Sequence, residues 1–402
     1  MRILIVNSIY PTPGAPKVIG GAEIFARQFA EALVARGNEV EVVRAASRPQ
    51  QEIETCNEAA IYSAPARNIY PPFSAQPAGP LRGIWHVMDD WSTAAPLVTD
   101  RINSFRPDVL HTNTLSGLTT GVWVAAHKSG VPIVHTLHDY YLTCPRCSRF
   151  SNGRTCTHTC LSCRLLTVNR RKNTAYVNAI VGVSQRVLDI HTEQGLFEQA
   201  RLRTVIRNAS LTDSLPPPRN KTKNQKPTFG FIGRLTEEKG IFNLIRAFAK
   251  IPADVARLVI AGRASESEQR HLRSMAPSAH IEFLGFVKPA SFYEMVDVVI
   301  APSIWEDPAP LVLVESWAAG RPVLGTPFGG IGEVIEPGVN GWITLPDSTS
   351  LADSISRIAK DPETTFAMTD ALAAKSKRRS LADVVTSYYS VFESVAKKAT
   401  SV

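Results

Sequence analysis

The first half of the chain alternates short apolar runs with longer segments of helical periodicity. A helix is predicted from Gly20 and Gly21 to Ala35, with Phe25 and Phe29 on one face and a stop at Gly37. The apolar runs predict strands at 3–6, 39–43, 108–110, 132–137 and 180–183. Short β-branched runs between helices are typical of a parallel sheet covered on both faces.

The alternation stops at a polar, basic, proline-rich segment, 214–227, which has the composition of a linker, and then restarts. The later apolar runs predict strands at 229–232, 258–261, 281–284, 298–301 and 323–325. The tail, 381–395, has the pattern of one more amphipathic helix. Two βαβ series joined by a linker predict an α/β protein of two doubly wound, Rossmann-like lobes with a cleft between them.

Composition places the chain among ordinary globular proteins. It has 402 residues, 44% of them hydrophobic and 20% charged, which favours two α/β domains over a single core. No apolar run reaches the length of about eighteen residues that a spanning helix needs. The opening MRILIVN is too short for a signal peptide and is interpreted as a buried strand, so we expect a cytoplasmic protein.

The formal net charge of +8 is modest for this length. It suits an enzyme that handles anionic substrates, with peripheral contact to the inner face of a membrane as a further expectation. Basic residues gather at Lys375, Lys377, Arg378 and Arg379. No aromatic RNA-binding stretch or helix-turn-helix pattern accompanies them, so we expect no nucleic acid partner.

The strongest local motif is GRLTEEKG, which directly follows the predicted strand 229–232. Ligands of open α/β sheets bind at the carboxyl ends of the strands. Gly233 permits close backbone approach, Arg234 offers a planar fork for phosphate oxygens, and Lys239 adds a charge at the next helix start. The motif predicts a pyrophosphate site. The alternative is a surface turn in which these cations pair with Glu237 and Glu238.

A second motif, PSIWEDPAPLVLVES, follows the predicted strand 298–301. Asp307 lies in the loop, and Glu315 lies on a predicted helix that begins at Leu311. Acids at this end of a sheet can accept hydrogen bonds from sugar hydroxyls and from a ribose diol. The alternative is that both acids are ordinary solvated carboxylates. This is less expected for Glu315, because a charge on an apolar helix usually needs a partner.

The first half carries weaker signals. Gly20-Gly21 before a helix is a weak indication of a phosphate cradle, because such a pair more often marks a turn. His138 closes the predicted strand 132–137 at its carboxyl end, the right position for a ligand contact. His135 lies three positions earlier and therefore on the opposite face, so the two are not expected to share a metal.

Taken in order, these motifs resemble the retaining family-4 glycosyltransferases. The motifs that carry the resemblance are GGAE from Gly20, HTLHD from His135, GRLTEEKG, FLGFV from Phe283 and the PSIWED block with Glu315. They span nearly the whole chain. The resemblance implies a GT-B fold, a nucleoside-diphosphate-sugar donor, and transfer with retention of configuration.

The resemblance also implies a role for each matching residue. Arg234 and Lys239 match the pyrophosphate ligands, and Glu315 matches the ribose ligand. His138 and Gly21 match residues of the first lobe that face the donor. The backbone near Phe286 and Val287 matches the strip that binds the base. The implied domains are 1–207, 208–380 and a terminal helix, 381–402, that crosses back to the first lobe. One position departs from the pattern: the first of the family's two glutamates is Asp307 here, and Glu306 is out of register.

Five of the six cysteines fall in one insertion, 144–163. Cys144, Cys147, Cys160 and Cys163 have the two-pair spacing of structural zinc sites, with Cys156 and His158 as alternates. The alternative is reduced thiols in a loop. No catalytic cofactor is expected.

The sequence therefore predicts a hexosyltransferase-type enzyme that moves a sugar from a UDP- or GDP-sugar to a glycan, lipid-linked or small-molecule acceptor. Surface polysaccharide or glycolipid synthesis is the expected setting. A nucleotide-sugar epimerase, or a catalytically silent scaffold that binds sugar nucleotides, is the alternative.

Overall fold

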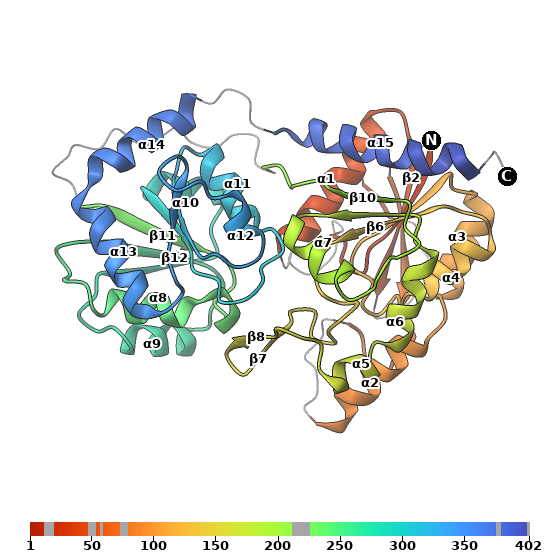
Figure 1. Cartoon of the computed structure of the whole chain (residues 1–402), viewed down its shortest axis with the longest axis horizontal. Coiled ribbons are helices and arrows are strands. Elements are labelled where there is room, and N and C mark those ends of the chain that lie inside the picture. The colour runs from red at the N-terminus through yellow and green to blue at the C-terminus, as the bar shows by residue number, and fades with distance from the viewer. Residues whose placement is uncertain are drawn as a thin grey trace. The chain divides into compact units, whose positions relative to one another are not determined.

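The computed structural model describes residues 1–11, 20–46, 54–56, 59–72, 79–210, 226–374 and 379–399. The chain divides into two compact units (Figure 1). The first unit contains Met1–Arg149, Cys156–Arg207 and Leu381–Val402, and the second contains Phe150–Thr155 and Asn208–Ser380. Most of the predicted linker, and the predicted basic cluster at Lys375, Lys377 and Arg378, lie outside the described residues.

The first unit is built on one sheet in the order β10-β9-β6-β5-β1-β2-β4-β3. All of its described pairings are parallel except that of β3 with β4. The strands are β1 (Arg2–Val6), β2 (Glu39–Ala46), β3 (Glu54–Cys56), β4 (Ala59–Pro65), β5 (Val109–Thr112), β6 (Ile133–Leu137), β9 (Ala179–Gly182) and β10 (Leu202–Val205). Every run predicted here from the sequence is a strand. The prediction missed β3, β4 and β10, whose small or polar residues lack a strong apolar run.

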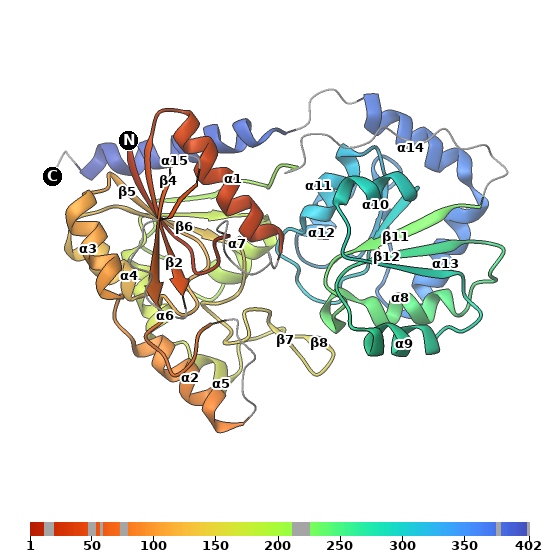
Figure 2. The same cartoon turned by 180° about the vertical axis from the view of Figure 1, so that it is seen from behind.

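Helices cover both faces of this sheet (Figures 1 and 2). They are α1 (Gly21–Ala35), α2 (Pro80–Trp91), α3 (Pro96–Phe105), α4 (Gly121–Lys128), α5 (Leu161–Leu165), α6 (Val168–Lys172), the 3-10 turn η1 (Asn173–Tyr176), α7 (Gln185–Thr192) and α15 (Leu381–Ala399). The terminal helix α15 packs on α1, where the rings of Tyr388 and Phe29 are 4.8 Å apart. The Tyr388 hydroxyl also lies 3.1 Å from Thr136 Oγ1 of β6. The end of the chain is thus part of the first unit.

The second unit has an all-parallel sheet in the order β13-β12-β11-β14-β15-β16. Its strands are β11 (Thr228–Ile232), β12 (Arg257–Ala261), β13 (Ile281–Gly285), β14 (Val298–Ala301), β15 (Val323–Gly325) and β16 (Gly341–Ile343), of which only β16 was not predicted. The helices are η2 (Glu237–Lys239), α8 (Ile241–Phe248), α9 (Glu266–Ser274), α10 (Pro289–Met295), α11 (Leu311–Ala318), α12 (Gly329–Val334), α13 (Ser348–Lys360) and α14 (Pro362–Ala374).

Two apolar layers hold the second unit together, one on each face of the sheet. Phe229 of β11 packs with Phe248 of α8 and Ile355 of α13 on one face. Phe292 of α10 and Ile331 of α12 pack on the other. Burial of such side chains contributes roughly 1.5–3 kcal/mol each. Because both faces are covered, the strands are largely apolar.

The hairpin of β7 (Phe150–Ser151) and β8 (Arg154–Thr155) belongs to the second unit. The Thr155 hydroxyl donates to the Ile304 carbonyl at 2.9 Å. From the sequence, this segment was predicted to be part of the first lobe, 1–207. A tertiary hydrogen bond from a short polar hairpin leaves no periodic signal in the sequence.

Candidate active site

The strand order of the second sheet reverses between β11 and β14, which are neighbours although two strands separate them in the chain. Connections that leave the centre of a parallel sheet in opposite directions create a binding crevice at the carboxyl ends of the strands. The two motifs found in the sequence follow these two strands. The fold therefore brings GRLTEEKG and PSIWED together at the switch point.

An ion pair joins the two loops. Lys239 Nζ donates to Asp307 Oδ2 at 2.5 Å, and the Ser303 hydroxyl donates to the same oxygen at 3.2 Å. Asp307 is only 4% exposed, so its charge needs this partner. Gly240 fits between the loops because a Cβ there would lie 1.9 Å from the Pro302 carbonyl oxygen. The tight approach places a cation and a carboxylate at the end of the sheet.

Arg234 lies at the surface of the same turn. Its side chain is 55% exposed, and its guanidinium lies 3.5 Å from the Glu238 carboxylate. An exposed pair of this kind stabilises a protein little, so the guanidinium can take a phosphate instead at little cost. The alternative to a pyrophosphate site was a surface turn in which both cations pair with Glu237 and Glu238. Arg234 does pair with Glu238, whereas Lys239 pairs with Asp307 instead.

The two adjacent acids of the second motif point to different partners. The Glu306 carboxylate accepts from the Gly329 backbone N–H at 2.7 Å. Gly330 N–H donates to the Asp307 backbone carbonyl at 2.8 Å. Gly329 has φ of +57°, and a Cβ there would lie 2.2 Å from the Asp307 carbonyl oxygen. The start of α12 is thereby fixed against both acids, and Glu306 is held by a backbone contact.

Glu315 lies on α11 with Leu311 at its start, and it has the partner that its apolar surroundings require. The Tyr293 hydroxyl of α10 donates to its carboxylate at 3.2 Å. Burial raises the pKa of Glu315 to about 7, although the Tyr293 hydrogen bond acts in the opposite direction. A carboxyl group poised in this way ionises readily when a ligand supplies further donors, such as the two hydroxyls of a ribose.

The end of β13 presents an aromatic ring. Phe286 is 69% exposed, and the Arg263 guanidinium, just after β12, lies 4.7 Å from the centre of its ring. Val287 follows, half-buried. Phe286 and Val287 were predicted from the sequence, whereas the contact of Arg263 with the Phe286 ring was not. The position of Arg263 directly after an apolar strand is the signal that points to it.

In the first unit, His138 lies just past β6. Its Nε2 is 3.1 Å from the Asn113 side-chain oxygen, and its ring is 5.7 Å from that of Phe25. Desolvation lowers the pKa of His138 to about 4, so the imidazole is neutral at physiological pH. Gly20 has an extended backbone at the start of α1, with Gly21 as the first helical residue. His138 thus lies directly after the carboxyl end of β6, where the sequence predicted it.

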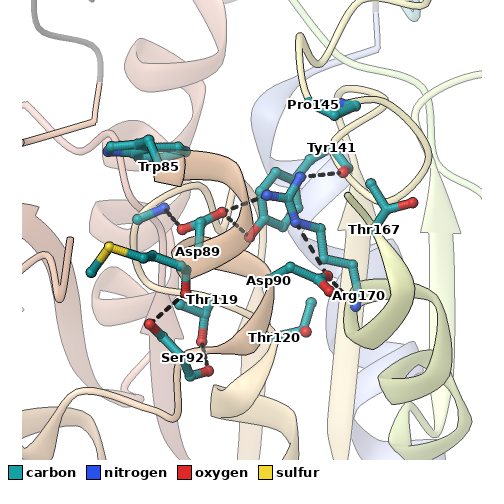
Figure 3. Close-up of polar contacts among 12 residues, drawn as sticks. Trp85, Asp89, Asp90, Ser92, Thr119, Thr120, Tyr141, Pro145, Thr167 and Arg170 are labelled. Atoms are coloured by element: carbon teal, nitrogen blue, oxygen red, sulfur yellow. Dashed lines mark hydrogen bonds and ion pairs between the residues drawn. The ribbon is translucent and has the colours of Figure 1, made fainter. Parts of the chain in front are cut away.

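A buried polar network that the sequence analysis missed supports the segment after His138 (Figure 3). The Asp139 carboxylate accepts from the Tyr141 N–H at 2.8 Å, and desolvation raises the pKa of Asp139 to about 6. The Tyr141 hydroxyl donates to Asp89 at 2.7 Å, and the Arg170 guanidinium reaches the same carboxylate at 2.8 Å. Arg170 also lies 4.1 Å from the centre of the Tyr141 ring. No local pattern links these residues, because 81 positions separate Asp89 and Arg170.

The five cysteines of the insertion are free thiols. Among the residues that the structure describes, no three His, Cys, Asp or Glu side chains are arranged to hold a metal ion. The predicted ligands Cys144, Cys147, Cys160 and Cys163 therefore do not form a metal-ligand set in this arrangement. Hydrogen bonding to the Ser162 hydroxyl and then to Cys163 lowers the pKa of Cys160 to about 7, which favours the thiolate form of this exposed side chain.

No helix in the described part of the chain is both long enough and apolar enough to cross a membrane.

Comparison with known proteins assigns the family. Residues 19–207 match the family described as Glycosyltransferase Family 4, and residues 216–375 match Glycosyl transferases group 1. The chain is 31% identical, over 336 residues, to an uncharacterized 42.6 kDa protein in the cps region of Klebsiella pneumoniae. That alignment covers 83% of this chain and 87% of the relative.

Solved structures show the same fold. Sucrose-phosphate synthase from Thermosynechococcus elongatus superposes with a TM-score of 0.71 at 19% identity, over 100% of this chain and 98% of the other. Anabaena HepE in complex with UDP superposes with a TM-score of 0.69 at 21% identity, over 98% of this chain and 100% of the other. The chain therefore belongs to the group 1 glycosyltransferases and has the GT-B fold of two Rossmann-like lobes.

Proposed function

We propose that this glycosyltransferase moves a hexose from a UDP- or GDP-sugar to its acceptor with retention of configuration. The donor class is inferred from the Lys239–Asp307 ion pair where β11 and β14 end, with the exposed Arg234 on the turn that also carries Lys239. Two cations at a switch point suit a pyrophosphate. The neighbouring carboxylate suits a sugar hydroxyl.

Each residue then has one role. Arg234 and Lys239 bind the pyrophosphate, with Gly233 allowing close approach of the chain. Glu315, in the middle of the helix that begins at Leu311, accepts from the ribose hydroxyls. Asp307 accepts from the donor sugar. The backbone of Phe286 and Val287 holds the base. His138, Gly20 and Gly21 act from the first unit on the sugar and its phosphates.

We propose that transfer uses no catalytic metal. Arg234 and Lys239 supply two positive charges for the leaving nucleoside diphosphate, and the sequence lacks an Asp-x-Asp motif at a strand end. Electrostatic stabilisation of a leaving group does not require a metal when fixed cations provide it. Activity should therefore survive brief treatment with EDTA. Loss of activity that magnesium or manganese restores would contradict the proposal.

For the acceptor we propose a glycan, lipid-linked or small-molecule substrate in surface polysaccharide or glycolipid synthesis. The Klebsiella pneumoniae relative is described as lying in a cps region, which supports a role of this kind. The binding of UDP by Anabaena HepE, which shares the fold, supports a uridine donor as the first to test.

The test is a thermal-shift screen of UDP-, GDP- and ADP-sugars, since a ligand that binds only the folded state raises Tm by mass action. Donors that stabilise the protein are then incubated without acceptor. We expect stabilisation by a UDP- or GDP-sugar and slow release of free sugar. Binding without any release, or conversion of the sugar to an isomer still attached to the nucleotide, would instead favour the scaffold or the epimerase. The Lys239→Ala variant, which lacks a phosphate ligand, is the control for specific binding.

A further inference from the structure

The helix α2 has its polarity reversed relative to an ordinary amphipathic helix. Its buried residues are Trp85, His86, Asp89 and Asp90, three of them polar. Its large exposed residues are all apolar: Leu81, Ile84, Val87, Met88 and Trp91. A helix on a globular core normally buries its apolar side. Here Trp91 is 66% exposed.

The buried polar network fixes this orientation (Figure 3). The Asp89 carboxylate accepts from the Arg170 guanidinium at 2.8 Å, from the Tyr141 hydroxyl at 2.7 Å and from the Gly117 N–H at 2.7 Å. Arg170 is fully buried. Rotating α2 to bury its apolar side would leave this buried arginine without its carboxylate, which costs roughly 3–5 kcal/mol. The network therefore holds the apolar side of α2 toward solvent.

Two short helices extend the exposed apolar surface. The Asp90 carboxylate accepts from the backbone N–H groups of Asn169 and Arg170, both at 2.9 Å, and so ties the start of α6 to α2. Both views show α5 beside α2 (Figures 1 and 2). Leu161 and Leu165 of α5 are 73% and 62% exposed. We call these residues, with Val168 of α6 and the five of α2, the apolar face.

The segments that carry the apolar face have exposed charge of one sign. The segments 59–88 and 140–188 contain no Asp or Glu. The two acids of α2, Asp89 and Asp90, are buried in the network. Arg82 lies on α2, Arg164 lies between the two exposed leucines of α5, and Lys172 ends α6. Exposed apolar side chains with basic residues beside them are the features of a surface that lies in a membrane interface.

We propose that the apolar face docks this protein on an anionic lipid bilayer. Its apolar side chains enter the interface between headgroups and acyl chains, and the basic residues contact lipid phosphates. Large exposed apolar patches on soluble units mark interaction sites, and the single sign of charge selects an anionic bilayer over a neutral surface. This docking does not depend on which donor sugar the enzyme uses.

The experiment is flotation of the full chain with phosphatidylcholine vesicles that contain or lack phosphatidylglycerol. We expect binding to the anionic vesicles, weakened by salt. Trp91→Gln and the double variant Leu161→Gln/Leu165→Gln should each lower the partition coefficient about tenfold, since each removes apolar area from the interface. Arg164→Glu should weaken binding to anionic vesicles only. Leu345→Gln is the matched control, because Leu345 is 58% exposed in the second unit.

All these positions are exposed, so circular dichroism and Tm should stay those of the parent protein. Failure of the parent to bind anionic vesicles would overturn the proposal. Equal binding by Trp91→Gln, by the leucine double variant and by the parent would also overturn it. So would a parent dimer that these variants convert to monomer in light scattering, because the apolar face would then be a protein interface.

Discussion

Lys239 Nζ and Asp307 Oδ2 lie 2.5 Å apart and join two loops whose residues are 68 positions apart in the chain. The pair supplies a cation to a buried carboxylate. A bound pyrophosphate would compete for the lysine, while a sugar hydroxyl would donate to the acid. The same two side chains therefore stabilise the two loops and, on our proposal, bind the donor.

Replacing Arg234 should affect binding and leave stability unchanged. In Arg234→Ala we expect UDP or GDP, whichever the parent binds, to bind about 2–3 kcal/mol more weakly, since a charge-assisted contact to phosphate is lost. Tm should not change, because the side chain is 55% exposed. Titration calorimetry measures the affinity. Arg270→Ala, at an exposed position of α9, is the control. Parent-like affinity in Arg234→Ala would remove Arg234 from the site.

Replacing Lys239 should affect both properties. Lys239→Ala leaves the Asp307 carboxylate without its cation, so we expect weaker nucleotide binding together with a lower Tm. The double variant Lys239→Ala/Asp307→Asn removes the uncompensated charge and should recover Tm, but not nucleotide affinity. Differential scanning calorimetry and nucleotide titration on the same samples separate the two effects. Recovery of affinity in the double variant would mean that Lys239 is only structural.

The two adjacent acids should differ in their kinetic effects. Asp307→Asn should lower turnover with the native donor much more than it weakens binding of the bare nucleotide, because the carboxylate would act on the sugar. Glu306→Gln keeps an oxygen that can accept from the Gly329 N–H, so we expect a small effect. Paired measurements of kcat and nucleotide affinity test this. If Glu306→Gln loses most of its turnover while Asp307→Asn keeps near-normal turnover, Glu306 is the acid that faces the sugar.

Glu315 should make stability depend on pH. Its pKa is raised from 4.5 to about 7 in the folded protein, so the folded state keeps a proton that the unfolded state loses. The free energy of unfolding should therefore fall as pH rises between these two values, by at most about 3 kcal/mol. Glu315→Gln should remove this dependence and raise stability near pH 8 (about one unit above the raised pKa). It should also weaken nucleotide binding there. Urea unfolding across this range is the measurement, and an unchanged pH profile in the variant would contradict the assignment.

Zinc binding by the cysteine insertion stays a prediction from its spacing. We expect near one equivalent of zinc per chain in protein purified without added metal, and loss of that zinc in Cys160→Ser/Cys163→Ser. Cys56→Ser, outside the insertion, is the control. Because the described thiols do not form a ligand set, they would have to draw together on binding. If the protein holds less than about a tenth of an equivalent of zinc and all the thiols of the insertion react freely, the insertion is a loop of reduced cysteines.

The residue pattern alone was enough to predict the two series of parallel strands and the motifs that follow them. Apolar runs in buried parallel strands, and glycines where a loop turns tightly, are local signals, so β11, β14, Gly240 and the motifs after them could be read in order. The resemblance then supplied a role for each position. The strands it missed, such as β4, are small-residue or polar segments that become strands because they pair with a neighbour.

Which of these groups meet is known only from the folded chain. The pairing of Lys239 with Asp307, the tie of the β7–β8 hairpin to Ile304, and the contact of Arg170 with Asp89 each join distant positions. The reversed polarity of α2 is the clearest case. Its pattern of apolar residues is that of a helix packed by its apolar side, yet a buried arginine far along the chain holds the polar side inward. The periodicity of apolar residues predicts that a helix has one apolar and one polar face. Which face is buried depends on the free energy of long-range charge pairing, and that is set by residues brought together only in the folded chain.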